Sequence, residues 1–207
     1  MFDIDLISRH FLALYFLFIA VHYASTAIGL SSRTAQSHIQ YGKKGSVTWW
    51  VRQVFNLFRG AILIVCIARV FFPIDPWLGV ITPLYNPWLL SIGMVTMLAS
   101  LGLVSYNHAY MRQDWRSGID NDKNRNLLTR GPFSRSRNPM FLAIMLGQLG
   151  LFLALPSLFT LVCLATGVAM IRLQASKEEQ ALQELYGDEY LQYQSQVPRW
   201  FKWMHTR

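Results

Sequence analysis

Charged residues are scarce in this sequence. Only 14% of its 207 residues are Asp, Glu, Lys or Arg, whereas 53% are hydrophobic, and the mean hydropathy is positive. A soluble globular domain normally has about a quarter of its residues charged. The composition therefore excludes an ordinary soluble domain and predicts an integral membrane protein.

Cysteine and the common cofactor-binding motifs are also scarce or missing. Cys66 and Cys163 both fall inside apolar runs, which is typical of small buried side chains and not of a disulfide pair. The histidines show no ligand spacing with one another or with carboxylates, so we predict no metal. None of the 13 glycines belongs to a G-x-G-x-x-G or G-x-x-x-x-G-K-[ST] motif, which excludes the dinucleotide-binding fold and the P-loop.

Long apolar runs are what the sequence has in abundance. Because about 20 apolar residues cross the hydrocarbon core, we predict an all-α integral membrane protein with five transmembrane helices. The last two are short and meet at Leu155 and Pro156 without a polar connector, which predicts a tight helical hairpin. The chain is expected to form one membrane domain, with its spans at residues 10–30, 54–72, 88–106, 140–155 and 156–173.

The distribution of basic residues predicts the orientation. The formal net charge is +8, but Lys and Arg beside apolar segments favour cytoplasmic loops, so we expect no nucleic-acid partner. Basic residues fill the loops after the first and third spans, whereas the loop after the second span carries only Asp75. The N-terminus should therefore lie outside, with the loop 107–138 and the tail 174–207 in the cytoplasm. The proline-rich outer connector shows no obvious chemistry.

Polar residues stand directly against the fourth apolar run in the segment SRSRNPMFLA. Pro139 suits the first position of a helix, and Asn138 is predicted to cap it. A helix N-terminus beside Arg135 and Arg137 suits a carboxylate or phosphate group. The alternative is that these arginines only anchor the helix to anionic lipid head groups.

The tail has the periodicity of an amphipathic helix. One stripe of side chains would either lie in the bilayer interface or face a site. The opposite face is acidic and rich in glutamine, which argues against binding of the helix to anionic lipid. Gly187 is expected to break or bend this helix. The predicted hairpin returns the tail to the side of Arg137, so the two segments should meet. The stripe consists of Glu178, Leu182, Tyr186, Tyr190, Tyr193 and Val197.

Together these segments resemble the integral-membrane methyltransferases of the isoprenylcysteine carboxyl methyltransferase and phospholipid methyltransferase superfamily. In that superfamily an Arg-His-Pro or Arg-Asn-Pro segment opens a helix and an apolar hairpin follows. A Glu-Glu pair, an aromatic-Gly pair, spaced tyrosines and a Val-Pro pair then close the chain. The matching residues lie between about 115 and 200 and are Arg137, Asn138, Pro139, Glu178, Glu179, Tyr186, Gly187, Tyr190, Tyr193, Val197 and Pro198.

This chain departs from the superfamily pattern at several positions. Asn138 stands where the eukaryotic prenylcysteine enzymes have histidine. Gln174 stands one turn before Glu178, where an arginine is expected. With five spans, the chain resembles a compact prokaryotic-type member in the cytoplasmic membrane.

The resemblance implies S-adenosylmethionine as methyl donor, bound on the cytoplasmic side by the ends of the hairpin and the tail. Arg137 would suit the cofactor carboxylate, and Glu178 or Glu179 its ammonium or ribose. Adenine or the sulfonium would contact the tyrosines. The implied cofactor site comprises Arg137, Asn138, Pro139, Glu178, Glu179, Tyr186, Gly187, Tyr190 and Tyr193.

The acceptor is expected to be lipophilic and to arrive from the bilayer. A prenylcysteine-like carboxylate needs no base, and Arg116 or Arg59 would hold it. A lipid amine or small thiol would need a proton removed by Glu178, His108 or a tyrosine. Two alternatives stay open, an NADPH-dependent reductase of the steroid-reductase type and a non-catalytic lipid-binding membrane protein.

Overall fold

Helices make up the fold. The computed structural model describes residues 3–33, 44–111 and 127–201, except for the side chains of residues 23–33. No strand occurs within these ranges, which confirms the all-α class. The long helices are α1 (Ile4–Arg33), α2 (Val47–Phe71), α4 (Pro87–Met111), α5 (Pro139–Ala154) and α6 (Leu158–Tyr186). The short ones are α3 (Asp75–Leu78), α7 (Asp188–Gln196) and the 3-10 turns η1 (Thr82–Leu84) and η3 (Gly131–Ser134).

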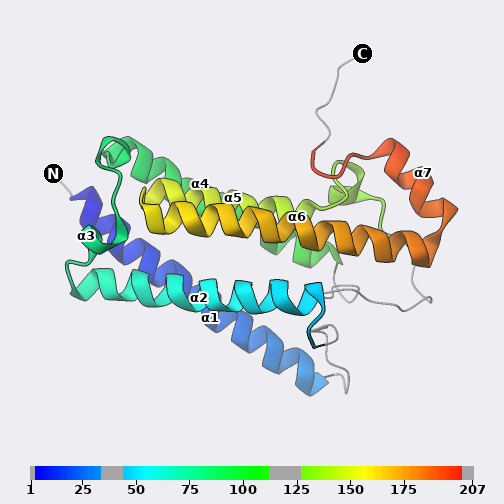
Figure 1. Ribbon diagram of the computed structural model, residues 1–207, viewed down its shortest axis with the longest axis horizontal. Helices are drawn as coiled ribbons and strands as arrows, with labels where there is room; N and C mark the ends of the chain where they lie inside the picture. Colours follow the sequence, from blue (N-terminus) through cyan, green and yellow to red (C-terminus); the bar gives the residue numbers. More distant parts are fainter. Residues whose placement is uncertain (1–2, 34–43, 112–126, 202–207) are drawn as a thin grey trace, which may run out of the picture.

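The long helices run up and down along the longest axis of the molecule (Figure 1). The start of α1, the end of α2, α3 and the α5–α6 turn lie at one end, which we call the clasp end. The start of α2, the start of α5, α7 and the C-terminus lie at the other, which we call the tail end. In this view α1 crosses α2 and diverges from the other helices toward the tail end.

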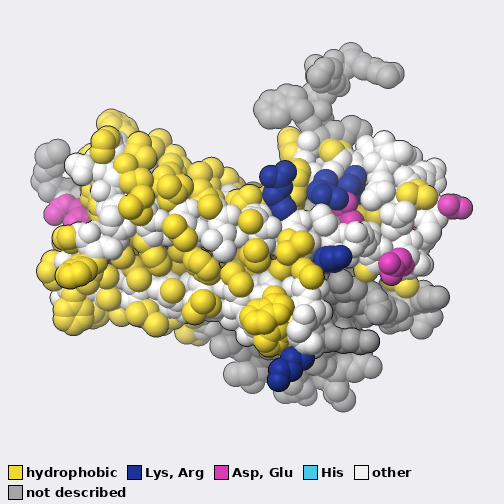
Figure 2. Space-filling view, viewed as in Figure 1, with side chains coloured by type: hydrophobic (Ala, Val, Ile, Leu, Met, Phe, Trp, Pro, Cys, Tyr) yellow, Lys and Arg dark blue, Asp and Glu magenta, His cyan; other side chains and the backbone are white. Residues whose placement is uncertain are grey.

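Four helices are long and apolar enough to cross a membrane, which indicates an integral membrane protein. Apolar side chains cover the surface from the clasp end through the middle of the molecule, and Lys and Arg side chains gather toward the tail end (Figure 2). α5 is apolar but has only 16 residues. Among the described residues, the helices that meet these criteria of length and apolarity are α1, through Ile4–His22, and α2, α4 and α6.

The expected division between the last span and a separate tail helix at residue 174 is not seen. α6 continues without interruption to Tyr186, because no glycine or proline stands between Gly167 and Gly187. The change at Gln174 alters the polarity of the side chains but not the backbone preference. Gly187, at φ +54°, ends α6 and turns the chain into α7. The predicted stripe is therefore divided between two helices.

Small residues allow α4 and α5 to approach closely. A Cβ atom on Gly93 would lie 2.2 Å from the backbone nitrogen of Ala154, so only glycine fits there. Ser100 Oγ donates to the carbonyl of Ala143 at 2.8 Å across the same interface. Close backbone approach and polar contacts between helices are the usual source of stability where lipid removes the hydrophobic effect. This packing fixes the position of α5, and with it the start of α5 at the tail end.

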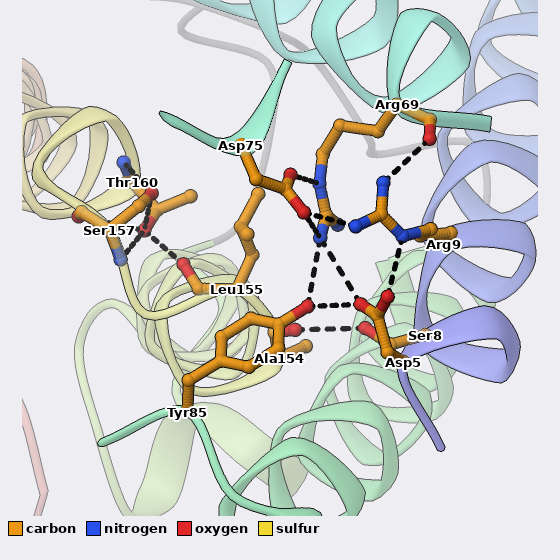
Figure 3. Close-up of polar contacts among 10 residues, drawn as sticks. All are labelled: Asp5, Ser8, Arg9, Arg69, Asp75, Tyr85, Ala154, Leu155, Ser157 and Thr160. Atoms are coloured by element: carbon orange, nitrogen blue, oxygen red, sulfur yellow. Dashed lines mark hydrogen bonds and ion pairs between the residues drawn. The ribbon is translucent and has the colours of Figure 1, made fainter. Parts of the chain in front are cut away.

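The clasp end contains a partly buried ionic cluster, the clasp, made of Asp5, Arg9, Arg69, Asp75 and Tyr85 (Figure 3). Arg69 is 1% exposed and donates from Nε to Asp75 Oδ1 at 2.6 Å and from Nη2 to the Tyr85 hydroxyl at 3.0 Å. Arg9 donates to Asp5 at 2.8 Å and also to Asp75, and Tyr85 donates to Asp5. Two cations and two anions thus balance each other. The outer connector, predicted to show no obvious chemistry, supplies Asp75 and Tyr85 to this cluster.

The clasp holds α1 against the hairpin turn. Ser8 Oγ, one residue before Arg9, donates to the carbonyl of Ala154 at 2.9 Å. In the turn itself, Ser157 and Thr160 form a capping box that starts α6. The start of α1, the ends of α2 and α5 and the start of α6 are therefore held together at the clasp end.

Asp75→Ala tests this arrangement. Removal of the carboxylate leaves the buried Arg69 guanidinium without its main anion, which should cost about 3 kcal/mol of unfolding free energy. The loss is measured by thermal unfolding in detergent beside Glu184→Ala, which removes an exposed carboxylate on α6. Equal unfolding temperatures for the two variants would contradict the structural role of the clasp.

Candidate functional site

One buried carboxylate connects three segments at the tail end. Glu179 of α6 is 4% exposed, and it accepts hydrogen bonds from Arg137 Nη2 at 3.0 Å, Asn138 Nδ2 at 2.9 Å and Arg199 Nη2 at 2.9 Å. Arg137 and Arg199 each donate a second bond to it, from Nε. We call Arg137, Asn138, Glu179 and Arg199 the Glu179 hub. Two guanidinium groups and one amide satisfy a charge that could not be buried alone.

Further hydrogen bonds, all accepted by backbone carbonyls, join the segment before α5 to the end of the tail. The Arg137 N–H donates to the carbonyl of Pro198 at 3.0 Å, and Arg137 Nη1 donates to the carbonyl of Val197 at 2.7 Å. Ser136 Oγ donates to the carbonyl of Arg199 at 3.2 Å. The structure thus brings together the segment before α5 and the end of the tail, 60 residues apart in sequence. The start of α5 cannot move without the tail.

Asn138 does not cap α5, contrary to the sequence analysis. No side-chain capping bond is present at this helix start, and the Asn138 amide donates to Glu179 instead. Pro139 takes the first helical position as predicted and is buried. The carboxylate captures the amide because a charged acceptor forms a stronger bond than a backbone group.

The neighbouring Glu178 has a different environment from Glu179. Its Oε1 accepts from Gln174 Nε2 at 2.9 Å, and Arg52 of α2 acts on it electrostatically. Gln174 is 8% exposed, and its Oε1 is buried without a hydrogen-bond partner among the described residues. The Glu178 side chain remains partly exposed. Of the two adjacent glutamates, this one keeps capacity to accept further bonds.

The tyrosines after Gly187 form a small core of their own. Tyr190 is fully buried and Tyr193 is 7% exposed, with their ring centroids 6.0 Å apart. The Tyr193 hydroxyl donates to the carbonyl of Phe133 in η3 at 2.7 Å. Burial, with the nearby Glu179 charge, raises the pKa of Tyr190 to about 12, and burial raises the pKa of Tyr193 as well. Both phenols are therefore neutral at physiological pH. The cluster is completed by Val197, Leu127, Leu182 and Tyr186.

The remaining predicted site residues lie nearby or outside the described ranges. His108 stands in the last turn of α4, at the tail end. Asn107 beside it is buried, and its Oδ1 has no hydrogen-bond partner among the described residues. Arg116 lies outside the described residues. Among the described residues, the structure therefore brings the hub and tyrosine residues together.

Several residues of this region were missed by the sequence analysis. Arg199 directly follows the Val-Pro pair. Ser136 lies between Arg135 and Arg137, and its residue type alone carries no signal for a contact with the tail. Arg52 comes from α2, far from either motif. A buried carboxylate needs cationic partners, and an arginine beside the Val-Pro pair was the available signal for Arg199.

Comparison with known families identifies the region that contains α4, α5 and α6. A family model described as phospholipid methyltransferase matches residues 88–189. Through these residues, the chain belongs to the phospholipid methyltransferase family. Methyl transfer in a membrane is therefore the general kind of activity that this membership supports. Searches with the whole chain match no curated protein and no solved structure.

The phospholipid methyltransferase region contains only part of the site. Arg137, Asn138, Glu178 and Glu179 lie within it, whereas Arg199 lies beyond its end. All five residues of the clasp also lie outside this region, since each of them precedes residue 88. The parts that hold the methyltransferase region in place are thus supplied by both flanks of the chain.

Glu179→Gln should loosen the tail. The change removes the charge that balances Arg137 and Arg199, at a cost of about 3 kcal/mol, so the amides of α7 should exchange with solvent on the order of a hundredfold faster. Hydrogen–deuterium exchange of residues 188–197 measures this rate, with Glu184→Gln as control. Unchanged exchange in α7 would mean that the tyrosine cluster alone holds the tail.

Alkaline pH should weaken the tyrosine cluster. Because the folded protein has a raised Tyr190 pKa, the contribution of this phenol to stability is complete below about pH 10 and falls as the pH rises toward 12. Tyrosinate absorbance, compared between wild type and Tyr190→Phe, isolates this titration. A wild-type component that titrates near pH 10 and disappears in the variant would contradict burial of Tyr190.

Proposed function

We propose that this protein transfers a methyl group from S-adenosylmethionine to a lipophilic acceptor at the tail end of the bundle. The observation that carries the proposal is the arrangement around α6, where Glu179 fixes the start of α5 and the tail beside Glu178. Family membership supports the reaction type. The geometry supports the place, because polar side chains converge there at the end of an apolar bundle.

The residues at this end fit the proposed cofactor. Its ammonium, ribose hydroxyls and adenine amine are hydrogen-bond donors. Among the described residues, Gln174 Oε1 and Asn107 Oδ1 are buried acceptors without a partner, and Glu178 adds a carboxylate that is partly exposed. Tyr186 is partly exposed and offers a ring for stacking. When bound, S-adenosylmethionine supplies an electrophilic methyl group on a sulfonium.

The two glutamates have separate tasks in this proposal. Glu179 has its acceptor capacity taken by two arginines and Asn138, so it positions the site. Glu178 contacts the ligand. Arg137 has partners on all three of its side-chain nitrogens, and its side chain is 12% exposed, so we propose that it contacts the cofactor carboxylate only through its exposed edge. Pro139, Tyr190, Tyr193 and Gly187 then shape the wall of the site.

Catalysis in this proposal depends on positioning. Methyl transfer is a displacement in which the acceptor atom, the methyl carbon and the sulfonium lie in line, and no covalent enzyme intermediate is needed. The hub fixes the elements that would hold both reactants, and the apolar bundle excludes water. For an amine or thiol acceptor, Glu178 or His108 would take up the released proton.

We propose that the tail end is cytoplasmic and that α5 crosses the membrane as a fifth span. Arg9 and Arg69 at the clasp end are both paired with Asp, so they contribute little net charge there. Arg130 and Arg135 at the tail end are exposed. This asymmetry follows the positive-inside bias and supports an N-terminus on the outside. Its amphipathic character would keep α7 at the membrane surface, in the cytoplasmic membrane of a prokaryote.

Glu178→Gln tests the cofactor site. We expect wild-type protein in detergent to bind S-adenosylhomocysteine with a dissociation constant on the order of micromolar, measured by calorimetry. Loss of the charged acceptor should weaken binding by roughly ten- to a hundredfold. Glu184→Gln, on an exposed face of the same helix, should bind like wild type.

Two other results would lead to different conclusions. Binding of NADPH in place of S-adenosylhomocysteine would favour a reductase. Binding of neither ligand by folded protein would favour a non-catalytic lipid-binding role. If S-adenosylhomocysteine binds, a labelled methyl group followed into lipid extracts identifies the acceptor.

A further inference from the structure

The side-chain amide of Gln174 has a fixed orientation. Its Nε2 donates to Glu178 Oε1 at 2.9 Å, one helical turn along α6. An ionised carboxylate oxygen accepts but does not donate, so the nitrogen of the amide faces the ionised form of Glu178. The carbonyl oxygen of Gln174 consequently points away from this bond.

That oxygen is an unusual feature in a buried position. Gln174 is 8% exposed, its Oε1 is buried, and no donor reaches it from any described residue. Ile171, one turn earlier on the same helix face, is buried and apolar. A buried carbonyl oxygen without a donor destabilises the folded protein, so such a group calls for a specific explanation.

We infer that Gln174 Oε1 and the free edge of the Glu178 carboxylate form a subsite for a hydrogen-bond-donating group, an ammonium or a hydroxyl. This inference rests on the proposed function and deepens it. The Gln174 oxygen is neutral, and the hydrogen bond of its amide nitrogen fixes its orientation. The Glu178 oxygen belongs to a carboxylate. A donor bound between them would satisfy both.

The same geometry rejects anions. Because the Gln174 amide nitrogen already donates to Glu178, an incoming carboxylate would face the oxygen atoms of Gln174 and Glu178. Arg52 of α2 acts electrostatically on Glu178, so an incoming carboxylate would have to compete with Glu178 for this cation. Gln174 is therefore a specificity-determining residue that selects a donor over a carboxylate at this position. The donor belongs either to the cofactor or to the head group of the acceptor.

Gln174→Leu tests the subsite, with Gln183→Leu as the matched control at an exposed position of the same helix. Gln174→Met, closer in shape, is made in parallel in case leucine impairs folding. Calorimetry measures binding of S-adenosylhomocysteine and of 5′-methylthioadenosine, which lacks the ammonium and carboxylate. Methyl transfer is measured with vesicles that contain an ethanolamine phospholipid and with a farnesylated cysteine carboxylate.

We expect one ligand to lose roughly tenfold in affinity, as befits one hydrogen bond. A loss for S-adenosylhomocysteine alone would assign the donor to the cofactor ammonium, and a loss for both nucleosides would assign it to the ribose or adenine. A raised KM for the aminophospholipid with cofactor binding intact would assign it to the acceptor. The unfolding temperature without ligand should stay at the wild-type value, because the variant removes an unsatisfied group.

Two results would overturn the inference. The first is that both Gln174 variants match Gln183→Leu in every binding constant and KM. The second is that the farnesylated carboxylate is methylated by the wild type and loses activity in Gln174→Leu. If wild-type protein binds neither nucleoside, the proposed function fails and the subsite fails with it, whereas wild-type binding with unaltered variants removes the subsite alone.

Discussion

The shared carboxylate of Glu179 is the interaction on which the tail end depends. Its two oxygens accept hydrogen bonds from Arg137 and Asn138, which precede α5, and from Arg199 at the end of the tail. Each of these donors would be costly to bury without it, and the carboxylate would be equally costly without them. Three segments far apart in sequence therefore take up their positions together, and the site has one arrangement.

The clasp end solves a related problem in a different place. Arg69 is buried at the end of α2, where lipid and protein leave it no water, and Asp75 and Tyr85 from the connector satisfy it. The bundle thus has an ionic cluster at each end and apolar packing between them. Glycine and serine contacts between α4 and α5 keep these two ends at a fixed distance. Loosening at either end would therefore shift the hairpin formed by α5 and α6.

Sequence patterns predicted the parts of this structure that depend on local composition. Apolar runs located the helices, Pro139 marked the start of α5 and Gly187 the end of α6, because each of these signals acts through the backbone of its own neighbourhood. Partners across the fold carry no such signal. Arg69 and Asp75 were not matched with each other, and Asn138 was expected to cap a helix when a distant carboxylate captures its amide. The continuation of α6 past Gln174 was missed because a change of polarity was taken for a change of element.

The pair Glu178–Glu179 shows how one helix can hold a scaffold and a site at once. Successive residues on an α-helix are rotated by about 100°, so adjacent side chains cannot share a face. Glu179 turns toward the segment before α5 and is saturated there, while Glu178 turns toward Gln174 and Arg52 of α2. The same rotation makes the roles impossible to exchange. A carboxylate at 179 that bound a ligand would release two arginines, and one at 178 that bound the arginines would leave the start of α5 without its anchor. The order of the two tasks along α6 follows from which neighbour each face meets.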